Sequence, residues 1–224
     1  MVTAAKAYRG MGMEGSVARW YDRITRKDMP EFQALAARIA ALVPARGSVL
    51  EVAPGPGFLS IELAQRRLDV CAVDISKTFV ELARRNAAAA VVTARFEVGN
   101  AAALPIPDGS QDFVVCRAAF KNFAEPVEAL REMRRVLRPG GKALLIDMRR
   151  DASMAEIRRY VNGLGVSWLN RLFMMVTFRA MLIKRAYPID DIRRMTAQAG
   201  WIDPRIDLSP IGFEGSLPCK PIRK

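Results

Sequence analysis

Between residues 48 and 147 the sequence alternates short runs of β-branched and other apolar residues with longer stretches of helical periodicity. This alternation is typical of βαβ units, in which helices connect parallel strands and cover both faces of the sheet. Strands are expected at residues 48–53, 69–74, 95–99, 113–117 and 143–147. The sequence therefore predicts an α/β fold on a doubly wound, mostly parallel sheet.

The expected strands are joined by helices that begin near Phe58, Ser76 and Pro126. Ser76 has the side chain of a helix N-cap. The Pro139-Gly140-Gly141 turn is expected to end the third helix, which carries core residues at helical spacing. These residues are Leu130, Met133 and Leu137. A last helix at 189–199 and two short strands at 202–207 and 212–217 would complete the sheet.

Two helical regions flank this pattern. Residues 13–42 are expected to form helices with a break near Pro30, and to cover one edge of the site. Their expected core residues are Phe32, Leu35, Ile39 and Leu42. Residues 152–186 interrupt the alternation with two helical segments that Gly163 and Gly165 separate, and side chains such as Met175 and Phe178 suit an apolar pocket. We expect one domain over residues 1–224, with this insertion as a cap on the substrate pocket.

The composition does not decide which class of ligand the protein binds, but it favours a small molecule over a nucleic acid. The formal net charge is +12, which is compatible with nucleic-acid binding, but the basic residues occur as scattered pairs such as Arg134-Arg135 and Arg149-Arg150. A solvated, exposed surface explains that distribution better. Three dispersed cysteines indicate neither a disulfide framework nor a zinc site, so no metal is expected. Without an evident signal peptide or transmembrane segment, we expect a cytoplasmic protein, and a homodimer stays open.

The strongest local motif runs from Val49 to Phe58, where a buried strand leads through a Gly/Pro turn into a helix. Gly55 and Gly57 allow the backbone to approach a ligand, and the helix start offers unpaired N–H groups. Any doubly wound protein also needs a tight turn here, so a purely structural role is the alternative. Asp74 ends the next strand at a spacing that suits a carboxylate accepting ribose hydroxyls. Because Ser76 is the better helix cap, Asp74 is expected to remain free for a ligand.

Five motifs occur in order along residues 48–147: the Val49–Gly57 loop, Asp74, residues 99–105, residues 107–113 and residues 137–141. Together they resemble the class I S-adenosylmethionine-dependent methyltransferases, particularly the branch of ubiquinone and menaquinone biosynthesis. The resemblance implies a Rossmann-like seven-stranded sheet with a reversed final strand. It also implies S-adenosylmethionine as the cofactor and methyl transfer to a small, apolar or aromatic molecule.

The resemblance also implies roles for individual residues. Glu51, Ala53 and Gly55 would border the methionine end of the cofactor. Asp74 would hold the ribose, and Asn100 with Ala101 would meet the adenine. Tyr21 would bond the methionine carboxylate or pack in the core, and Arg117 would line the methionine or substrate side. The complete expected cofactor site is Tyr21, Glu51, Ala53, Gly55, Gly57, Asp74, Ile75, Asn100, Ala101 and Arg117.

The chain departs from the family pattern in three places. Ala53 replaces the first glycine of the loop, so its backbone must avoid positive φ or tolerate a methyl group there. Asn100 replaces an aspartate and keeps an acceptor oxygen without the charge. Lys121-Asn122 stands where relatives carry histidines, and the chain contains no histidine. No residue is therefore assigned as a catalytic base, and alignment of the reactants could suffice.

Three other functions remain as alternatives. A nicotinamide-dependent dehydrogenase would use a similar loop and acidic residue, but the later motifs fit it poorly. A nucleic-acid methyltransferase is compatible with the net charge. However, the sequence has Cys116-Arg117-Ala118 where amino-methylating DNA enzymes carry their motif. The Pro218-Cys219 pair lies too near the C-terminus to supply a cytosine-attacking nucleophile. A protein that binds the cofactor without turnover is the third alternative.

Overall fold

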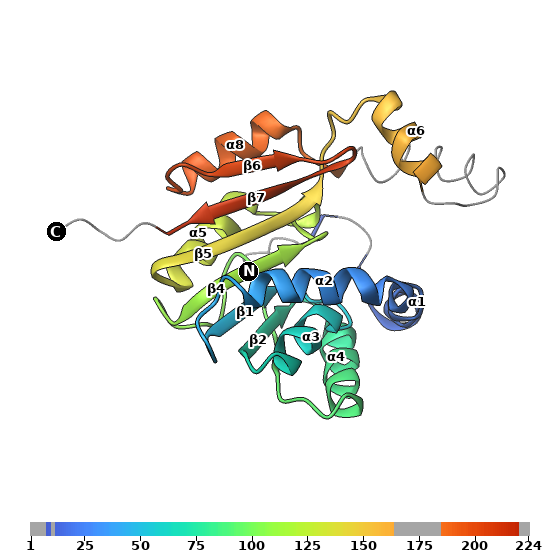
Figure 1. Cartoon of the computed structure of the whole chain (residues 1–224), viewed down its shortest axis with the longest axis vertical. Coiled ribbons are helices and arrows are strands. Elements are labelled where there is room, and N and C mark those ends of the chain that lie inside the picture. The colour runs from blue at the N-terminus through green and yellow to red at the C-terminus, as the bar shows by residue number, and fades with distance from the viewer. Residues whose placement is uncertain (1–7, 10–11, 164–184, 220–224) are drawn as a thin grey trace, which may run out of the picture.

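The computed structural model describes residues 8–9, 12–163 and 185–219. Its centre is a seven-stranded sheet of order β3-β2-β1-β4-β5-β7-β6 (Figure 1). Strands β1 to β5 are parallel, whereas β7 runs antiparallel to both β5 and β6. The strands are β1 (Ser48–Val52), β2 (Asp69–Asp74), β3 (Arg95–Val98), β4 (Gln111–Arg117), β5 (Leu137–Met148), β6 (Arg205–Leu208) and β7 (Gly212–Pro218). The predicted α/β class and its mostly parallel sheet are confirmed.

The order of the strands creates a switch point in the middle of the sheet. The chain builds β1, β2 and β3 outward in one direction, then returns to place β4 on the other side of β1. Loops that leave the carboxyl ends of β1 and β4 consequently diverge, and a crevice opens between them.

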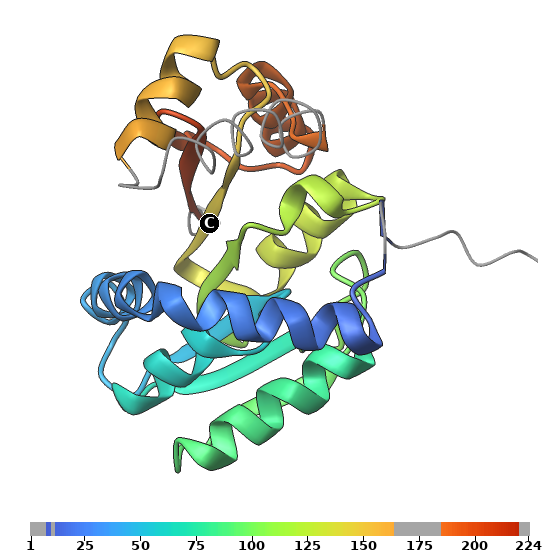
Figure 2. The same ribbon diagram turned by 90° about the vertical axis from the view of Figure 1, so that its right-hand side faces the viewer.

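Helices cover both faces of this sheet. Helices α2, α3 and α4 pack on one face, against residues such as Val49 and Ala72, while α5 and α8 pack on the other, against Leu50 and Val114. Helix α1 packs along α4 at the edge of the sheet (Figure 2). The helices are α1 (Gly15–Thr25), α2 (Met29–Ala40), α3 (Phe58–Gln65), α4 (Lys77–Ala89), α5 (Pro126–Val136), α6 (Met154–Gly163) and α8 (Ile189–Gln198), with short 3₁₀ helices η1 (Arg26–Asp28) and η2 (Phe120–Asn122).

The sequence signals explain several of these elements. The Ser76 hydroxyl accepts a hydrogen bond from the Phe79 amide at 3.1 Å, which confirms Ser76 as the N-cap of α4. On α5, Leu130 and Met133 are buried at the predicted spacing. Burying this apolar stripe against the sheet stabilises the helix, because most helical stability in proteins comes from tertiary packing.

The boundary between α5 and β5 differs from the prediction. The helix ends at Val136 and β5 begins at Leu137, so the Pro139-Gly140-Gly141 turn falls inside the strand. Gln111 pairs with Leu137 but Phe113 pairs with Lys142, which makes a bulge that accommodates the turn. Gly140, at φ +87°, provides the backbone conformation that this irregularity requires.

Other boundaries also needed correction. The break in the N-terminal helical region lies at η1 (Arg26–Asp28), before Pro30, because proline fits the first turn of α2. Phe32, Leu35 and Ile39 are buried as predicted, but Leu42 is 55% exposed because α2 ends before it. β6 begins at Arg205, later than expected, whereas α8 begins at Ile189 as predicted.

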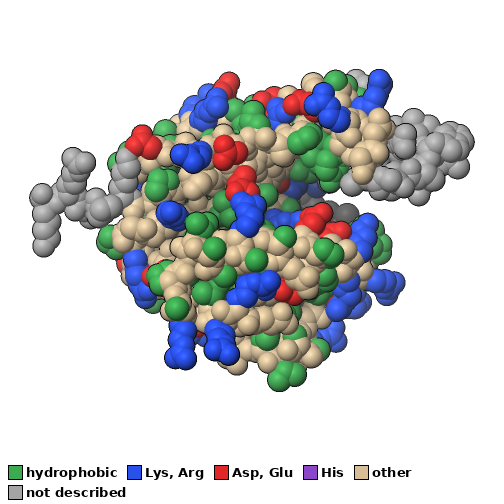
Figure 3. Space-filling view, in the orientation of Figure 1, with side chains coloured by type: hydrophobic (Ala, Val, Ile, Leu, Met, Phe, Trp, Pro, Cys, Tyr) green, Lys and Arg blue, Asp and Glu red, His purple; other side chains and the backbone are tan. Residues whose placement is uncertain are grey.

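The basic surface is mixed in sign. Lys and Arg side chains are scattered among acidic and neutral groups over the face in Figure 3. Arg66, Arg135 and Arg193 form ion pairs with nearby carboxylates. Arg149 is an exception to the predicted exposure, since it is buried and pairs with Glu156 at the start of α6.

The predicted cap is described only in part. Helix α6 forms its first segment, while residues 164–184, including Gly165, Met175 and Phe178, lie outside the described residues. Among residues 8–9, 12–163 and 185–219, no helix has the length and apolar character that spanning a bilayer requires.

Candidate functional site

A cavity of about 680 Å³ lies at the switch point of the sheet. Its walls come from the carboxyl ends of β1, β2 and β4, from α1 and α2, and from the segment around η2. The surface is hollowed between the part that carries α6 and the part that carries α1 and α2 (Figure 3). This volume is in the range of sites for small molecules.

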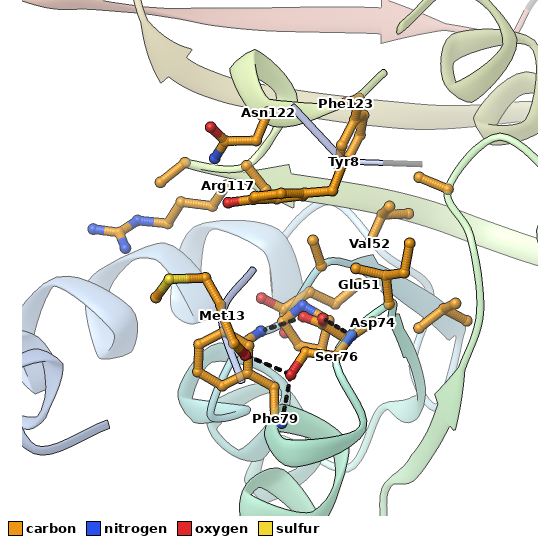
Figure 4. Close-up of a pocket in the computed structure, with 18 of the residues that line it drawn as sticks. Tyr8, Met13, Glu51, Val52, Asp74, Ser76, Phe79, Arg117, Asn122 and Phe123 are labelled. Atoms are coloured by element: carbon orange, nitrogen blue, oxygen red, sulfur yellow. Dashed lines mark hydrogen bonds between the residues drawn. The ribbon is translucent and has the colours of Figure 1, made fainter. Parts of the chain in front are cut away.

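Figure 4 shows that the labelled lining residues fall into two groups. Glu51, Asp74 and Ser76 lie toward one end, near Met13 and Phe79. Arg117, Asn122 and Phe123 lie toward the other end, with Tyr8 beside them. We call them the β1–β2 end and the β4 end of the cavity.

The β1 loop brings backbone to the β1–β2 end. Ala53 adopts φ +58°, so the backbone takes the left-handed conformation with a methyl group in place. A side chain with only one carbon tolerates this conformation at a cost of about 1 kcal/mol. Gly55, at φ +55°, faces open space among the described residues, of which a Cβ there would meet only Tyr21 Cε1, at 3.9 Å, within a 4 Å radius. A ligand can therefore approach the backbone at Gly55.

Gly57 has a different role from Gly55. A Cβ on Gly57 would lie 2.8 Å from Ala83 Cβ, so this glycine lets the loop pack closely on α4. It is not among the residues that line the cavity. The structure therefore gives Gly57 a packing role. Contact between Gly57 and the cofactor stays a prediction, and the position of Gly57 does not favour it.

Asp74 ends β2 with its carboxylate at the cavity. The side chain is buried, and its two oxygens accept hydrogen bonds from the Ser76 amide at 2.9 Å and the Gly55 amide at 3.0 Å. Ser76 caps α4 as expected, Asp74 makes these two local hydrogen bonds in addition, and its availability to a ligand stays a prediction. Burial raises the pKa of Asp74 to about 6, against the lowering effect of these amides. Asp74 connects the β1 loop to the end of β2, and each oxygen keeps a lone pair for a ligand.

Glu51 is the second buried carboxyl group at this end. It is 4% exposed and accepts a hydrogen bond from the Ser60 hydroxyl on α3. Burial raises its pKa to about 7, although the Ser60 bond and the charge of Arg117 lower it. Glu51 can consequently change its protonation state near neutral pH.

The loop after β3 forms another part of the wall. The Asn100 side-chain oxygen accepts a hydrogen bond from the Ala102 amide at 3.0 Å, which holds a turn closed by the Asn100–Ala103 bridge. Asn100 and Ala101 both line the cavity. The Asn100 side-chain oxygen therefore stabilises the shape of this loop. Contact between Asn100 and a ligand stays a prediction.

Tyr21 and Ile75 line the same end. The Tyr21 ring packs edge-on against Phe79 with centroids 5.8 Å apart, and burial raises its pKa. Its two proposed roles, in the core and in the site, are therefore both compatible with its position. Ile75 remains 42% exposed.

At the β4 end, Arg117 is held by two neighbours from α2. It forms an ion pair with Glu31 at 2.9 Å, and its guanidinium lies 4.7 Å from the centre of the Phe32 ring. The next residue, Ala118, has φ +59°, so β4 ends in the same left-handed conformation as the β1 loop. Strained backbone at the ends of both central strands is typical of a functional site.

The β4 end also contains residues that the sequence patterns did not identify as site residues. Lys121 and Asp147 form a buried ion pair at 2.8 Å, and Lys121 lines the cavity beside Asn122. Tyr8 reaches the cavity through a short antiparallel bridge to Phe123. The only sequence signal for the Lys121–Asp147 pair was the departure from the family pattern at Lys121-Asn122. No local sequence pattern could place Tyr8 at the cavity.

The structure brings together nine of the ten predicted cofactor residues in one cavity: Tyr21, Glu51, Ala53, Gly55, Asp74, Ile75, Asn100, Ala101 and Arg117. Gly57 lies behind this wall. Their convergence does not by itself identify the ligand, so each individual role stays a prediction.

Comparison with known proteins shows what this chain is similar to. Residues 50–145 match the model of a methyltransferase domain. A demethylmenaquinone methyltransferase of Deinococcus radiodurans is 39% identical over 148 residues, which are 63% of this chain and 61% of that protein. The ubiquinone/menaquinone biosynthesis C-methyltransferase UbiE of Geobacter sulfurreducens is 33% identical over 106 residues, which are 45% of this chain and 41% of that protein. Both relatives are thus matched over less than two thirds of their length.

Solved structures confirm the fold. A candidate S-adenosylmethionine-dependent methyltransferase of Methanococcus maripaludis superimposes with a TM-score of 0.70 at 23% identity, covering 96% of this chain and 97% of that one. The [4+2]-cyclase SpnF also shares the fold, with a TM-score of 0.60 at 17% identity over 85% of this chain and 81% of its own. The fold alone therefore does not define the reaction.

Residues 50–145 are thus similar to a methyltransferase domain, and the described fold is similar to that of the candidate methyltransferase of Methanococcus maripaludis.

Proposed function

We propose that this protein transfers the methyl group of S-adenosylmethionine to a small apolar or aromatic acceptor. The observation that carries the proposal is one cavity that combines eight predicted cofactor residues with Arg117 and the rest of the separate β4 end. One space that is continuous between two differently built ends suits two ligands that react with each other.

The β1–β2 end fits the cofactor in its chemistry. Open space at Gly55 allows a ligand to lie against the backbone, and the buried Asp74 carboxylate can accept hydroxyl hydrogen bonds. Ile75 and Ala101 offer apolar contacts to a planar base, while Tyr21 offers a hydroxyl. When bound, S-adenosylmethionine supplies an electrophilic methyl group on a sulfonium centre.

The protein's contribution is alignment and exclusion of water. The residues at the end of β1 would fix the cofactor, and those at the β4 end would hold the acceptor against it. Phe32, Phe123 and Met148 give the β4 end apolar surface. This surface and the quinone-related names of the relatives support an aromatic acceptor such as a demethylated quinol.

Calorimetry provides the first test. S-adenosylmethionine and S-adenosylhomocysteine should bind with micromolar affinity, at about −7 to −8 kcal/mol, and NAD should not bind. If the folded protein binds NAD and neither of the other two, the dehydrogenase alternative holds. Absence of any binding would contradict the proposal.

A turnover assay provides the second test. S-adenosylhomocysteine should accumulate when the protein is incubated with cofactor and a panel of hydroquinones and naphthols, and the methylated product should be visible by mass spectrometry. Transfer to RNA or DNA in the same assay would favour the nucleic-acid alternative. Cofactor binding without transfer to any acceptor would favour a protein that uses this fold for another purpose, as the fold of SpnF allows.

A further inference from the structure

We propose that Lys121, held by Asp147, forms a binding site for an ionised hydroxyl group of the acceptor. This inference rests on the proposed function, because it defines the acceptor as a phenolate or enolate. The site lies at the β4 end of the cavity, and its ligand is an aromatic or enolic molecule that carries one anionic oxygen.

The contacts of Lys121 fix its ammonium group in one place. Lys121 Nζ donates to Asp147 Oδ1 at 2.8 Å and to the Ala118 carbonyl at 2.6 Å. The Lys121 amide donates to Asp147 Oδ2 at 2.9 Å, and the Met148 amide donates to Asp147 Oδ1 at 2.7 Å. Backbone and side chain together thus set the position of both charges.

The ammonium group keeps one N–H for a ligand. It has three donors, and within the described part of the chain two of them have acceptors, Asp147 and Ala118. Lys121 lines the cavity, and its side chain is 10% exposed, compared with 1% for Asp147. Asp147 is therefore the buried anchor, and Lys121 is the partner that meets the cavity.

A purely structural role does not explain this pair well. Taking both charges out of water is costly, and apolar side chains of similar volume often serve stability equally well or better. A charged pair in a cavity wall has a further use, since the cation can hold an anionic ligand in surroundings of low polarity. Asn122 and Arg117 line the cavity close by in the sequence and add further N–H donors.

The absence of histidine makes this site chemically useful. The chain contains no histidine to remove a proton from the acceptor. A site that selects the ionised form from solution makes a protein base unnecessary, because the hydroxyl proton goes to water before the acceptor binds. The anionic oxygen, or a ring carbon conjugated with it, then attacks the methyl carbon, while the bond from that carbon to sulfur breaks and its electron pair stays on S-adenosylhomocysteine. After attack by a ring carbon, the proton on that carbon is lost to water.

The wild-type protein can be tested with 4-nitrophenol, a phenol whose absorbance reports its ionisation. In the presence of S-adenosylhomocysteine, the bound phenol should have an apparent pKa lower by about one unit than in water. 4-Nitroanisole, which has a similar shape and cannot ionise, should bind about tenfold more weakly than the phenolate. Equal affinity for the two compounds, or no shift in ionisation, would overturn the proposal.

Variants assign the effect to Lys121. The double variant K121M/D147N removes both charges and avoids leaving a lone carboxylate in the core. It should lose the shift and the preference for phenolate, whereas Lys121→Arg should retain most of both. As a matched control, R131M/E128Q removes an exposed ion pair on α5 and should behave as wild type.

The affinity for S-adenosylhomocysteine separates the two proposals. If K121M/D147N binds it normally and still shifts the phenol, Lys121 has no part in the acceptor site while the proposed function stands. If the wild-type protein does not bind S-adenosylhomocysteine, the proposed function itself has failed. Should the double variant not fold, the comparison of nitrophenol with nitroanisole on the wild-type protein still decides whether the cavity holds an anion.

Discussion

The two ends of the cavity are built in different ways. At the β1–β2 end, backbone conformation and backbone N–H groups define the site, as in the amides of Gly55 and Ser76 that hold Asp74. At the β4 end, charged side chains from separate elements hold one another, as in the pairs Lys121–Asp147 and Arg117–Glu31. The first end depends on short-range geometry, and the second depends on the assembled fold.

This difference predicts different responses to substitution. At the β4 end, removing one charge of an ion pair should leave the opposite charge without its partner. At the β1–β2 end, the effects should come from protonation, from lost ligand contacts and from backbone strain.

The largest effect is expected for Lys121→Met. Because Asp147 would remain buried without its ammonium partner, the free energy of unfolding should fall by about 4 kcal/mol. K121M/D147N should recover most of this loss. Urea denaturation at neutral pH measures both variants, and a single variant as stable as wild type would show that the pair is not coupled.

Glu51→Gln tests the other end through pH. Burial raises the Glu51 pKa to about 7 from 4.5, so the folded state holds a proton that the unfolded state releases. The resulting stabilisation is complete below pH 4.5 and is lost as the pH rises to about 7. Wild type should lose about 3 kcal/mol relative to E51Q over this interval. A difference between the two proteins that does not change with pH would contradict a buried, titrating carboxyl group.

Asp74→Ala should reduce cofactor affinity by about 2 to 3 kcal/mol, because it removes a charged acceptor for the ribose. Asp69→Ala, at the exposed start of the same strand, is the matched control and should leave the affinity unchanged. Calorimetric titration with S-adenosylhomocysteine measures both. If D74A binds as wild type does, the role of Asp74 is limited to its bonds with Gly55 and Ser76.

The smallest effect concerns the two alanines with positive φ. Replacing Ala53 or Ala118 with glycine removes the steric cost of the left-handed conformation and should stabilise the fold by about 1 kcal/mol each. Thermal or urea denaturation would show the change. A loss of stability in either variant would mean that the methyl group packs usefully despite the strain.

The same difference explains how far the sequence could be interpreted. The β1 loop and Asp74 could be placed at the cavity from the sequence because a tight strand-to-helix turn and the acidic end of the next strand are marked by certain residue types at short spacing. The α/β class and the mostly parallel sheet followed from the alternation of strands and helices, and the seven strands with a reversed final strand followed from the resemblance. Boundaries at η1 and at the start of β5 were misplaced because proline suits a first helical turn and a bulge can absorb Pro139 and Gly140.

The β4 end could not be assembled from the sequence in the same way. Lys121 and Asp147 meet because η2 follows β4 and Asp147 lies on the neighbouring strand β5. Arg117 meets Glu31 across elements that are distant in the chain. The local burial of Asp74 beside two amides was also missed, because it depends on how closely the β1 loop approaches the end of β2.

The bridge between Tyr8 and Phe123 has a consequence for the order of folding. It joins two segments that lie on either side of β1, β2, β3 and β4 in the sequence, and the Arg9 amide donates to the Asn122 carbonyl at 2.7 Å. Closing so long a loop is entropically costly until the intervening sheet has formed, so this contact should form late in folding. Its few bonds should also open before those of the sheet, and hydrogen exchange at Arg9 should be fast compared with that of the β1 amides.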